Sequence, residues 1–221
     1  AMSKFSNFHF TATSSTKKRL IRMGEIKKNI FVVGCPSIDA LKQEKNENFN
    51  KIKKKFSIDV LQDYILVIQH PVTTEIKDVH KQFIETIEAL KKFKMQKLFV
   101  FPNNDAGSSK IINLIKKNKF NHCQTLSLKE YKTLLKMSCA LIGNSSSGIH
   151  EAATFKIPVV NIGTRQKGRM RGINVIDANY NKNDIYNAIK TILKPGFKKK
   201  IKFMKNPYGD GNSAKKIIQI I

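Results

Sequence analysis

The sequence predicts an α/β fold built on a doubly wound parallel sheet, with helices on both of its faces. Short apolar segments alternate with amphipathic ones almost throughout the 221 residues, which is the pattern of successive strand–helix units. Residues 63–69 (Asp-Tyr-Ile-Leu-Val-Ile-Gln) are apolar on both faces, as expected of a fully buried parallel strand. The apolar fraction of 41% is enough for a sizeable core. These observations favour one large domain with short appendages.

The expected strands are short apolar runs that end at turn residues or loops. The second of them ends at Gly34, and the third ends at His70-Pro71. The runs span residues 8–11, 30–33, 63–69, 97–101, 125–126, 140–143 and 159–162.

Helices are expected between these strands. The hydroxyl-rich residues 13–16 provide an N-cap for a helix that reaches Arg22, and Pro36 opens the helix after the second strand. Apolar residues recur at helical spacing between Thr73 and residue 93, at Val79, Phe83, Ile87 and Leu90. Further helices are expected at residues 108–117, 128–137, 146–155, 183–193 and 213–221.

The loops that follow the strands are the candidate ligand-binding segments, because a doubly wound sheet binds ligands beyond the carboxyl ends of its strands. The loop Gly143-Asn144-Ser145-Ser146-Ser147-Gly148 leads from a strand into a helix. Small residues and free amides at a helix start favour an anion. Glu151 follows one turn later, where its carboxylate could accept hydrogen bonds from two vicinal hydroxyls. A nucleoside diphosphate fits this pattern, and a helix N-cap with surplus serines is the alternative.

The net charge of +25 raises a nucleic-acid-binding module as an alternative function. The lysines are spread along the chain, and their densest runs, 53–55 and 198–200, lack interleaved stacking aromatics. Arginine suits phosphate recognition better than lysine, so its scarcity favours a generally solvated basic surface. Arginine occurs only at Arg19, Arg22, Arg165, Arg169 and Arg171. Heparin retention and its salt dependence would test the alternative.

Three cysteines, Cys35, Cys123 and Cys139, are odd in number and widely spaced, so free thiols in a reducing compartment are expected. The first residues lack the apolar segment of a secretory signal, and no run of about 18 apolar residues could span a membrane. We therefore expect a cytoplasmic location and neither a metal site nor a cofactor.

Several blocks of the sequence resemble, in the same order, those of the hydrolysing UDP-N-acetylglucosamine 2-epimerases of bacterial sialic-acid synthesis. The resemblance covers nearly the whole chain from His9 to about Ser213, and it implies the C-terminal, Rossmann-like lobe of a two-lobed GT-B-like fold. The blocks are Gly-Cys-Pro-Ser-Ile-Asp (34–39), Gln-His-Pro-Val-Thr-Thr-Glu (69–75), Phe-Pro-Asn-Asn-Asp-Ala-Gly-Ser (101–108), residues 143–152 and residues 157–169.

The resemblance implies a set of contacts to UDP. Ser145 and Ser146 would bind the diphosphate, and Glu151 the ribose hydroxyls. Arg165 would reach the phosphate side of the cleft. The other implied residues are Asn103 on the nucleotide, Leu126 framing uracil through its backbone, and His70 serving both UDP binding and catalysis.

Some of these residues have a plainer interpretation. His70 could be a strand-end histidine bonded to backbone, and Asp105 fits an ordinary turn. His150 is expected to face away from the ligand. Several members of the family carry glutamate after the Gly-Arg pair, whereas this chain has Met170-Arg171, which puts the exact sugar in doubt.

The resemblance also implies the organisation of the chain and its reaction. Residues 1–29 would be the end of an N-terminal lobe and the hinge, 30–203 the UDP-binding domain, and 204–221 a helix crossing back to the other lobe. The implied enzyme converts UDP-N-acetylglucosamine to N-acetylmannosamine plus UDP, and the full-length enzyme is expected to be a homo-oligomer. Because the proton-transferring carboxylates of the family lie in the N-terminal lobe, we expect this chain alone to be inactive. The alternatives are the same reaction on UDP-N,N'-diacetylbacillosamine and a GT-B glycosyltransferase.

Overall fold

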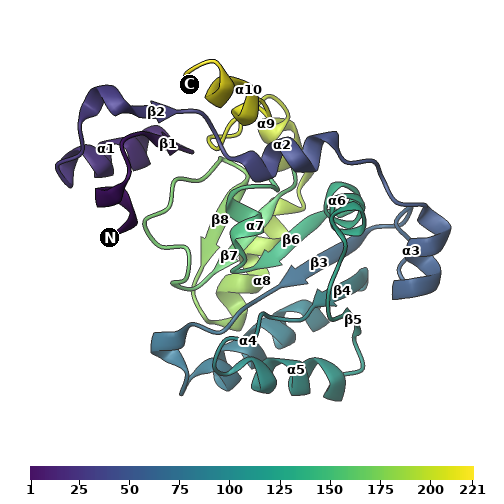
Figure 1. Ribbon diagram of the computed structural model, residues 1–221. Helices are drawn as coiled ribbons and strands as arrows, with labels where there is room; N and C mark the ends of the chain where they lie inside the picture. The colour runs from purple at the N-terminus through teal and green to yellow at the C-terminus, as the bar shows by residue number, and fades with distance from the viewer.

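The computed structural model describes residues 1–221 and contains a six-stranded, wholly parallel sheet in the order β5-β4-β3-β6-β7-β8 (Figure 1). The strands are β3 (Tyr64–Ile68), β4 (Gln96–Val100), β5 (Asn121–Cys123), β6 (Ala140–Gly143), β7 (Val159–Ile162) and β8 (Val175–Ala178). Within this sheet the chain begins at the central strand β3 and continues outward through β4 to β5 at one edge. It then returns to the centre at β6 and continues through β7 to β8 at the other edge. This order is that of a nucleotide-binding doubly wound sheet, so the predicted fold class is confirmed.

Helices cover both faces of the sheet. As a result, β3 is buried along its whole length, with alternate side chains pointing to opposite faces. Ile65 and Val67 belong to one core cluster, with residues of α4 (Val79–Lys91), α5 (Ser108–Lys117) and α8 (Lys182–Ile192). Tyr64, Leu66 and Ile68 belong to the other cluster, with residues of α3 (Phe49–Phe56) and α6 (Leu128–Met137).

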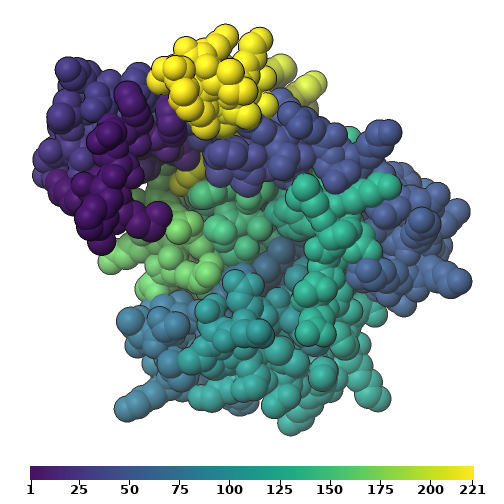
Figure 2. Space-filling model, viewed as in Figure 1, coloured from purple at the N-terminus to yellow at the C-terminus, as the bar shows by residue number.

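The N-terminal residues form a separate small unit. Strands β1 (His9–Thr11) and β2 (Ile30–Val32) pair in parallel across α1 (Ser14–Arg22) and do not join the main sheet. Thr13 caps α1 through its side chain, as the sequence predicts. Short 3₁₀ turns, η1 (Met2–Phe5) and η2 (Lys27–Asn29), complete the unit, which bulges from one end of the molecule in Figure 2.

The C-terminal residues lie at the same end of the molecule (Figure 2). Helix α10 (Ser213–Ile218) packs against α2 (Pro36–Gln43), where the backbone N–H of Ala214 donates to Asp39 Oδ2 at 2.8 Å. Helix α9 (Pro195–Ile201) precedes it. No helix of the chain has the length and apolar character needed to cross a membrane.

Three of the expected elements are wrong in position or extent. The strand expected at 125–126 lies at Asn121–Cys123, where exposed Asn121 and His122 pair with β4 at the sheet edge and give no apolar run. The helix expected at 146–155 ends at Ile149, as α7 (Ser146–Ile149), and turns follow. The helix expected from Thr73 begins at Val79, after the 3₁₀ turn η3 (Thr73–Glu75).

Three elements were not expected from the sequence: α3, α9 and β8. Helix α3 lies in a lysine-rich segment, although Asn48 caps it and Ile52 and Phe56 are buried four residues apart. Strand β8 is a short edge strand whose Asp177 is exposed, so its apolar pattern is weak.

Candidate functional site

The loops after β3 and β6 meet at the point where the strand order reverses, which is the usual ligand-binding position of such a sheet. Gly143 ends β6 with φ of 134°. A Cβ atom there would lie 2.1 Å from the carbonyl oxygen of Ile68, so only glycine allows this approach. The same carbonyl accepts hydrogen bonds from the N–H groups of Asn144 and Ser145, at 3.1 and 3.3 Å. The two loops are therefore locked together where they leave the sheet.

Asn144 ties three loops to one another. Its side-chain Oδ1 accepts from the backbone N–H of His70 at 2.7 Å, and its Nδ2 donates to the His70 carbonyl at 2.8 Å. Its own carbonyl accepts from Arg165 Nη1 at 3.2 Å and from Gln166 Nε2 at 2.8 Å. Asn144 thus fixes His70 and the 163–172 loop against the start of residues 143–148, the serine loop. We call the region where these three loops meet the crevice.

His70 is buried at the end of β3 and is held as a neutral imidazole. Its Nδ1 accepts the backbone N–H of Asn103 at 3.2 Å, which leaves the ring hydrogen on Nε2. Burial, followed by the Arg165 charge, lowers the pKa of His70 to about 4, although the Asp105 charge acts in the opposite direction. The strand-end interpretation is correct for Nδ1, whereas Nε2 makes no hydrogen bond within the chain and could donate to a ligand.

The serines lie at the start of α7, directly after Asn144. Ser145 is the N-cap, and its Oγ accepts the backbone N–H of Ser147 at 3.3 Å. The hydroxyl of Ser146 makes no hydrogen bond within the chain, and the residue is half-buried. One serine therefore caps the helix, and the next leaves a hydroxyl unused.

Glu151 follows α7 and has one carboxylate oxygen without a partner. Its Oε1 accepts from Ser37 Oγ on α2 at 3.2 Å, while Oε2 is buried and makes no hydrogen bond. Burial raises the pKa of Glu151. The hydroxyl of Tyr131 on α6 is also buried and makes no hydrogen bond of ordinary geometry, although Ser147 lies near it. Burial, followed by the Glu151 charge, raises the pKa of Tyr131, and Ser147 opposes this shift. Glu151 Oε2 thus keeps a free acceptor beside α7.

Sequence reasoning missed Ser37 and Tyr131. Ser37 lies in the block at 34–39 that supports the family resemblance, so that block was the available signal. Tyr131 lies in α6 between Glu130 and Lys132, and the sequence gives no sign that its hydroxyl lies near Glu151.

The other predicted site residues, Arg165, Asn103 and Leu126, differ in their exposure and in their contacts with the crevice. Arg165 is half-buried, and Asp105 lies close enough for its charge to affect the guanidinium. The Asn103 side chain is exposed, and its part in the crevice is the backbone contact to His70. Leu126 is half-buried, packs against the core on the α3 and α6 face, and shares no hydrogen bond with the other site residues.

His150 and Asp105 have structural surroundings. His150 stacks on Tyr208, with ring centroids 3.9 Å apart, and burial followed by the Arg169 charge lowers its pKa to about 4. The carbonyl of Asp105 accepts from the N–H of Ser108, as a turn before α5 requires. Both observations agree with the plainer interpretation of these residues.

A cavity of about 560 Å³ opens beside Arg165. Two of its lining residues are joined by the hydrogen bond from Thr164 Oγ1 to Glu75 Oε1 at 2.5 Å. It is lined by Pro71, Val72, Thr73, Thr74, Glu75, Asp105, Thr164, Arg165 and Lys167. A guanidinium, an imidazole N–H and a free hydroxyl at the crevice suit an anion, and the cavity gives room for the group attached to it.

Comparison with known proteins places the chain in a family. The whole chain, residues 1–221, matches the family described as UDP-N-acetylglucosamine 2-epimerase. It is 37% identical to the UDP-N,N'-diacetylbacillosamine 2-epimerase (hydrolyzing) of Legionella pneumophila, covering 100% of this chain and 59% of that one. It is 33% identical to the polysialic acid biosynthesis protein P7 of Escherichia coli, covering 100% of this chain and 58% of that one.

Solved structures show the same fold. The UDP-GlcNAc 2-epimerase from Neisseria meningitidis, bound to UDP-GlcNAc, superposes with a TM-score of 0.82 at 20% identity, over 99% of this chain and 62% of that one. The enzyme from Methanocaldococcus jannaschii, in complex with UDP-GlcNAc and UDP, gives 0.78 at 23% identity, over 97% and 60%. The chain thus spans about three-fifths of the length of the proteins that it matches. Its sequence and its fold agree, and the chain belongs to the UDP-N-acetylglucosamine 2-epimerase family.

Proposed function

We propose that this chain is the UDP-binding part of a hydrolysing 2-epimerase, which converts UDP-N-acetylglucosamine to N-acetylmannosamine and UDP. The observation that carries the proposal is the presence of two polar groups without partners at the two ends of α7. The Ser146 hydroxyl has no partner at the start of α7, and the buried Oε2 of Glu151 has none just after it. A diphosphate at the first and a ribose diol at the second would satisfy both.

The phosphate end of this proposal includes Ser145, Ser146 and Arg165. When UDP leaves the sugar, negative charge grows on the β-phosphate, so donors and a guanidinium already in position would stabilise the transition state. Arg165 is held by the Asn144 carbonyl through one Nη atom, which leaves its other donors for phosphate.

His70 acts here as a hydrogen-bond donor to the leaving phosphate. Its low pKa makes it neutral near pH 7, so Nε2–H would orient an oxygen without adding a full charge. Asn103 and Leu126 would flank the base, Asn103 through the loop that also positions His70.

A second candidate substrate is UDP-N,N'-diacetylbacillosamine. The 37% identity to a relative named for that substrate favours it, whereas the 30% identity to the Neisseria meningitidis UDP-N-acetylglucosamine 2-epimerase covers 86% of this chain. Both substrates share UDP, so the crevice residues serve either one. Direct competition of the two nucleotide sugars for the full-length protein would decide between them.

We further propose a division of the chain at residues 29 and 203. Residues 1–29 and 204–221 would belong to the boundary with a second lobe, and residues 30–203 would bind UDP. The pairing of β1 with β2 apart from the main sheet supports a separate N-terminal unit, although that unit includes β2 (Ile30–Val32) and so extends to residue 32. The three unpaired thiols support a cytoplasmic setting, and the full-length enzyme would be a homo-oligomer.

Calorimetric titration with UDP tests the proposed site. The chain should bind UDP weakly, with a Kd near the millimolar range, or roughly −4 kcal/mol, because only one wall of a cleft is involved. Ser146→Ala combined with Glu151→Ala should abolish the heat of binding. Ser14→Ala combined with Glu88→Ala, at exposed positions on α1 and α4, is the matched control and should bind UDP normally. Equal UDP affinity in the crevice double variant would show that the site is assigned wrongly.

A further inference from the structure

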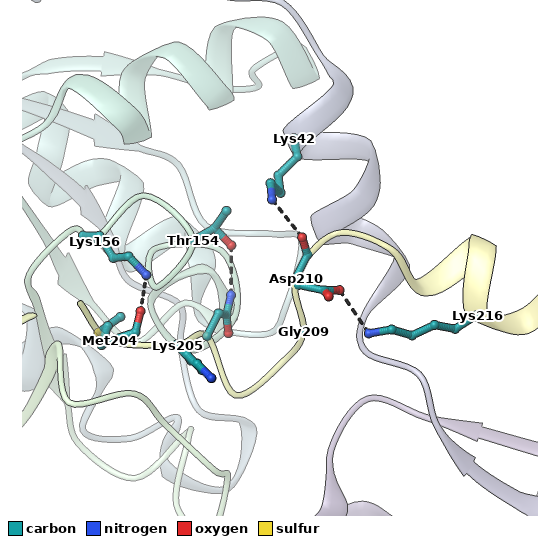
Figure 3. A pocket seen from close by; sticks show the side chains of 9 residues that line it. Lys42, Thr154, Lys156, Met204, Lys205, Gly209, Asp210 and Lys216 are labelled. Atoms are coloured by element: carbon teal, nitrogen blue, oxygen red, sulfur yellow. Dashed lines mark hydrogen bonds and ion pairs between the residues drawn. The ribbon is translucent and has the colours of Figure 1, made fainter. Parts of the chain in front are cut away.

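A second cavity lies away from the crevice, between α2, the turns after α7 and the C-terminal segment (Figure 3). Its volume is about 490 Å³, within the range of roughly 300–1,000 Å³ that small-molecule sites occupy. Only one of its lining residues, Met204, is apolar. The lining of the cavity is therefore polar, and its charged side chains determine which ligands it can bind.

The wall of this cavity carries a surplus of positive charge. Four lysines line it, from segments far apart in the sequence, and Asp210 is the only carboxylate among the lining residues. Lys216 Nζ pairs with Asp210 Oδ1 at 3.1 Å, so three of the four ammonium groups have no carboxylate partner in the cavity. The lysines are Lys42, Lys156, Lys205 and Lys216.

Two of the ammonium groups are held at the wall by backbone carbonyls. Lys42 Nζ donates to the Asp210 carbonyl at 2.8 Å, and Lys156 Nζ donates to the Met204 carbonyl. Figure 3 shows both side chains bent toward the C-terminal segment. Their rotamers are thus already restricted, which reduces the entropy that an anion must remove when it binds.

Lys156 adopts a backbone conformation that lysine ordinarily avoids. Its φ is 58°, in the left-handed region, where glycine fits without strain and a residue with a Cβ atom does not. The chain nevertheless has an ammonium-bearing residue at this turn, and its side chain reaches the cavity. Lys119 has the same backbone conformation, so Lys156 is distinguished by its ammonium group, which lines the cavity.

The cavity also adjoins the crossing of two chain segments. A Cβ atom on Gly209 would lie 3.0 Å from Gly34 Cα, and Cys35 N–H donates to the Tyr208 carbonyl at 2.8 Å. An anion held by Lys42, Lys156 and Lys205 would connect α2, the turn at Lys156 and the segment that precedes α10, and would stabilise this crossing.

We propose that this cavity binds a small phosphorylated anion through Lys42, Lys156 and Lys205. The site is separate from the UDP crevice and does not depend on the function assigned there. Phosphoryl oxygens would accept from the Lys42 and Lys156 ammonium groups, which now donate to carbonyls, and from Lys205, which has no hydrogen bond in the chain. The residual positive charge of the cavity would favour a doubly or more highly charged molecule.

The test is amide NMR of the full chain during titration with inorganic pyrophosphate at low ionic strength. The amides of Gly209 and Gly211 report on the cavity, and those of Ser146 and Ser147 report on the crevice. Lys156→Gly removes the ammonium while glycine keeps the turn relaxed, so this variant should fold. Lys119→Gly is the matched control, because Lys119 has the same left-handed backbone (φ 54°), is exposed and lies outside the cavity.

Wild type and Lys119→Gly should show saturable shifts at Gly209 and Gly211 with the same Kd. Lys156→Gly should raise that Kd roughly tenfold, as expected for one lost charge-assisted contact, and leave the crevice shifts unchanged. Lys205→Gln, at an exposed residue without hydrogen bonds in the chain, should weaken binding in the same direction. Equal weakening by Lys119→Gly and Lys156→Gly, or shifts confined to the crevice, would overturn the proposal.

Discussion

His70 shows how one side chain can be both structural and reactive. Its backbone is paired with Asn144, its Nδ1 is occupied by the Asn103 amide, and only Nε2 is left for a ligand. Burial disfavours the charged ring, which lowers its pKa. A histidine buried as a neutral ring makes stability depend on pH.

The stability of the chain should fall as the pH drops from about 6.5 toward 4. The unfolded histidine takes up a proton near pH 6.5, whereas folded His70 resists protonation down to a pKa of about 4. Its contribution is complete above the unfolded pKa and is lost at lower pH, with a slope of at most about 1.4 kcal/mol per pH unit. His150 has the same direction of shift, so it contributes in the same window.

Urea unfolding at pH 7 and pH 5 measures this effect. His70→Asn keeps an acceptor for the Asn103 amide and removes the titrating ring, so the pH dependence should become shallower. His80→Asn, at an exposed position on α4, should leave it unchanged. An identical pH dependence in wild type and His70→Asn would contradict the burial of a neutral ring.

Arg165 should discriminate phosphate from nucleoside. Lysine retains the charge but loses the planar fork, so Arg165→Lys should weaken UDP roughly tenfold and uridine less than about twofold. Titration with both ligands separates the two effects, and Arg22→Lys at an exposed position on α1 is the control. Equal losses for UDP and uridine would make Arg165 a structural residue.

The close contact between the ends of strands β3 and β6 depends on Gly143. Gly143→Ala places a methyl group 2.1 Å from the Ile68 carbonyl at a left-handed φ, so it should destabilise the fold by about 2–4 kcal/mol. Gly196→Ala in α9, where a Cβ meets nothing within 4 Å, should instead stabilise by up to about 1 kcal/mol. Chemical unfolding of both variants checks this, and a neutral Gly143→Ala would refute the close approach.

Elements with strong local signals could be predicted from the sequence with their boundaries. Helix α6 is one of them, because Ser127 and Glu130 cap it reciprocally and its apolar spacing is regular. Helix α7 was predicted too long, although Ile149, Ala152 and Ala153 are all buried as helical spacing suggests. The N–H of Ala152 bonds to the Ser147 carbonyl five residues back, so the regular helix ends there.

The residues of the site likewise differ in whether a local sequence pattern reveals them. The serine loop, His70 and Arg165 could be found because their loops follow predicted strands. The contact of Ser37 with Glu151 joins residues 114 apart in sequence, and no local pattern reveals it. The lysine-lined cavity has no sequence signature either, because its lysines come from separate segments.

For the whole molecule, we expect this chain alone to release no N-acetylmannosamine from UDP-N-acetylglucosamine. Inversion at C2 needs an acid and a base placed on opposite faces of the sugar. Among the carboxylates near the crevice, Glu75 already accepts from Thr164 and Gln82, and Glu151 lies beside Ser37. Incubation with the nucleotide sugar and assay of both products checks this, and slow turnover abolished by His70→Ala would contradict it.

The central claim is that the crevice between β3 and β6 binds UDP, and a crystal structure of the chain soaked in UDP tests it most directly. The account predicts the β-phosphate against Ser145 and Ser146 within reach of Arg165, and the ribose hydroxyls on Glu151. The phosphate should also lie within hydrogen-bond distance of His70 Nε2. UDP found only in the lysine-lined cavity, with the serine loop unoccupied, would contradict the account.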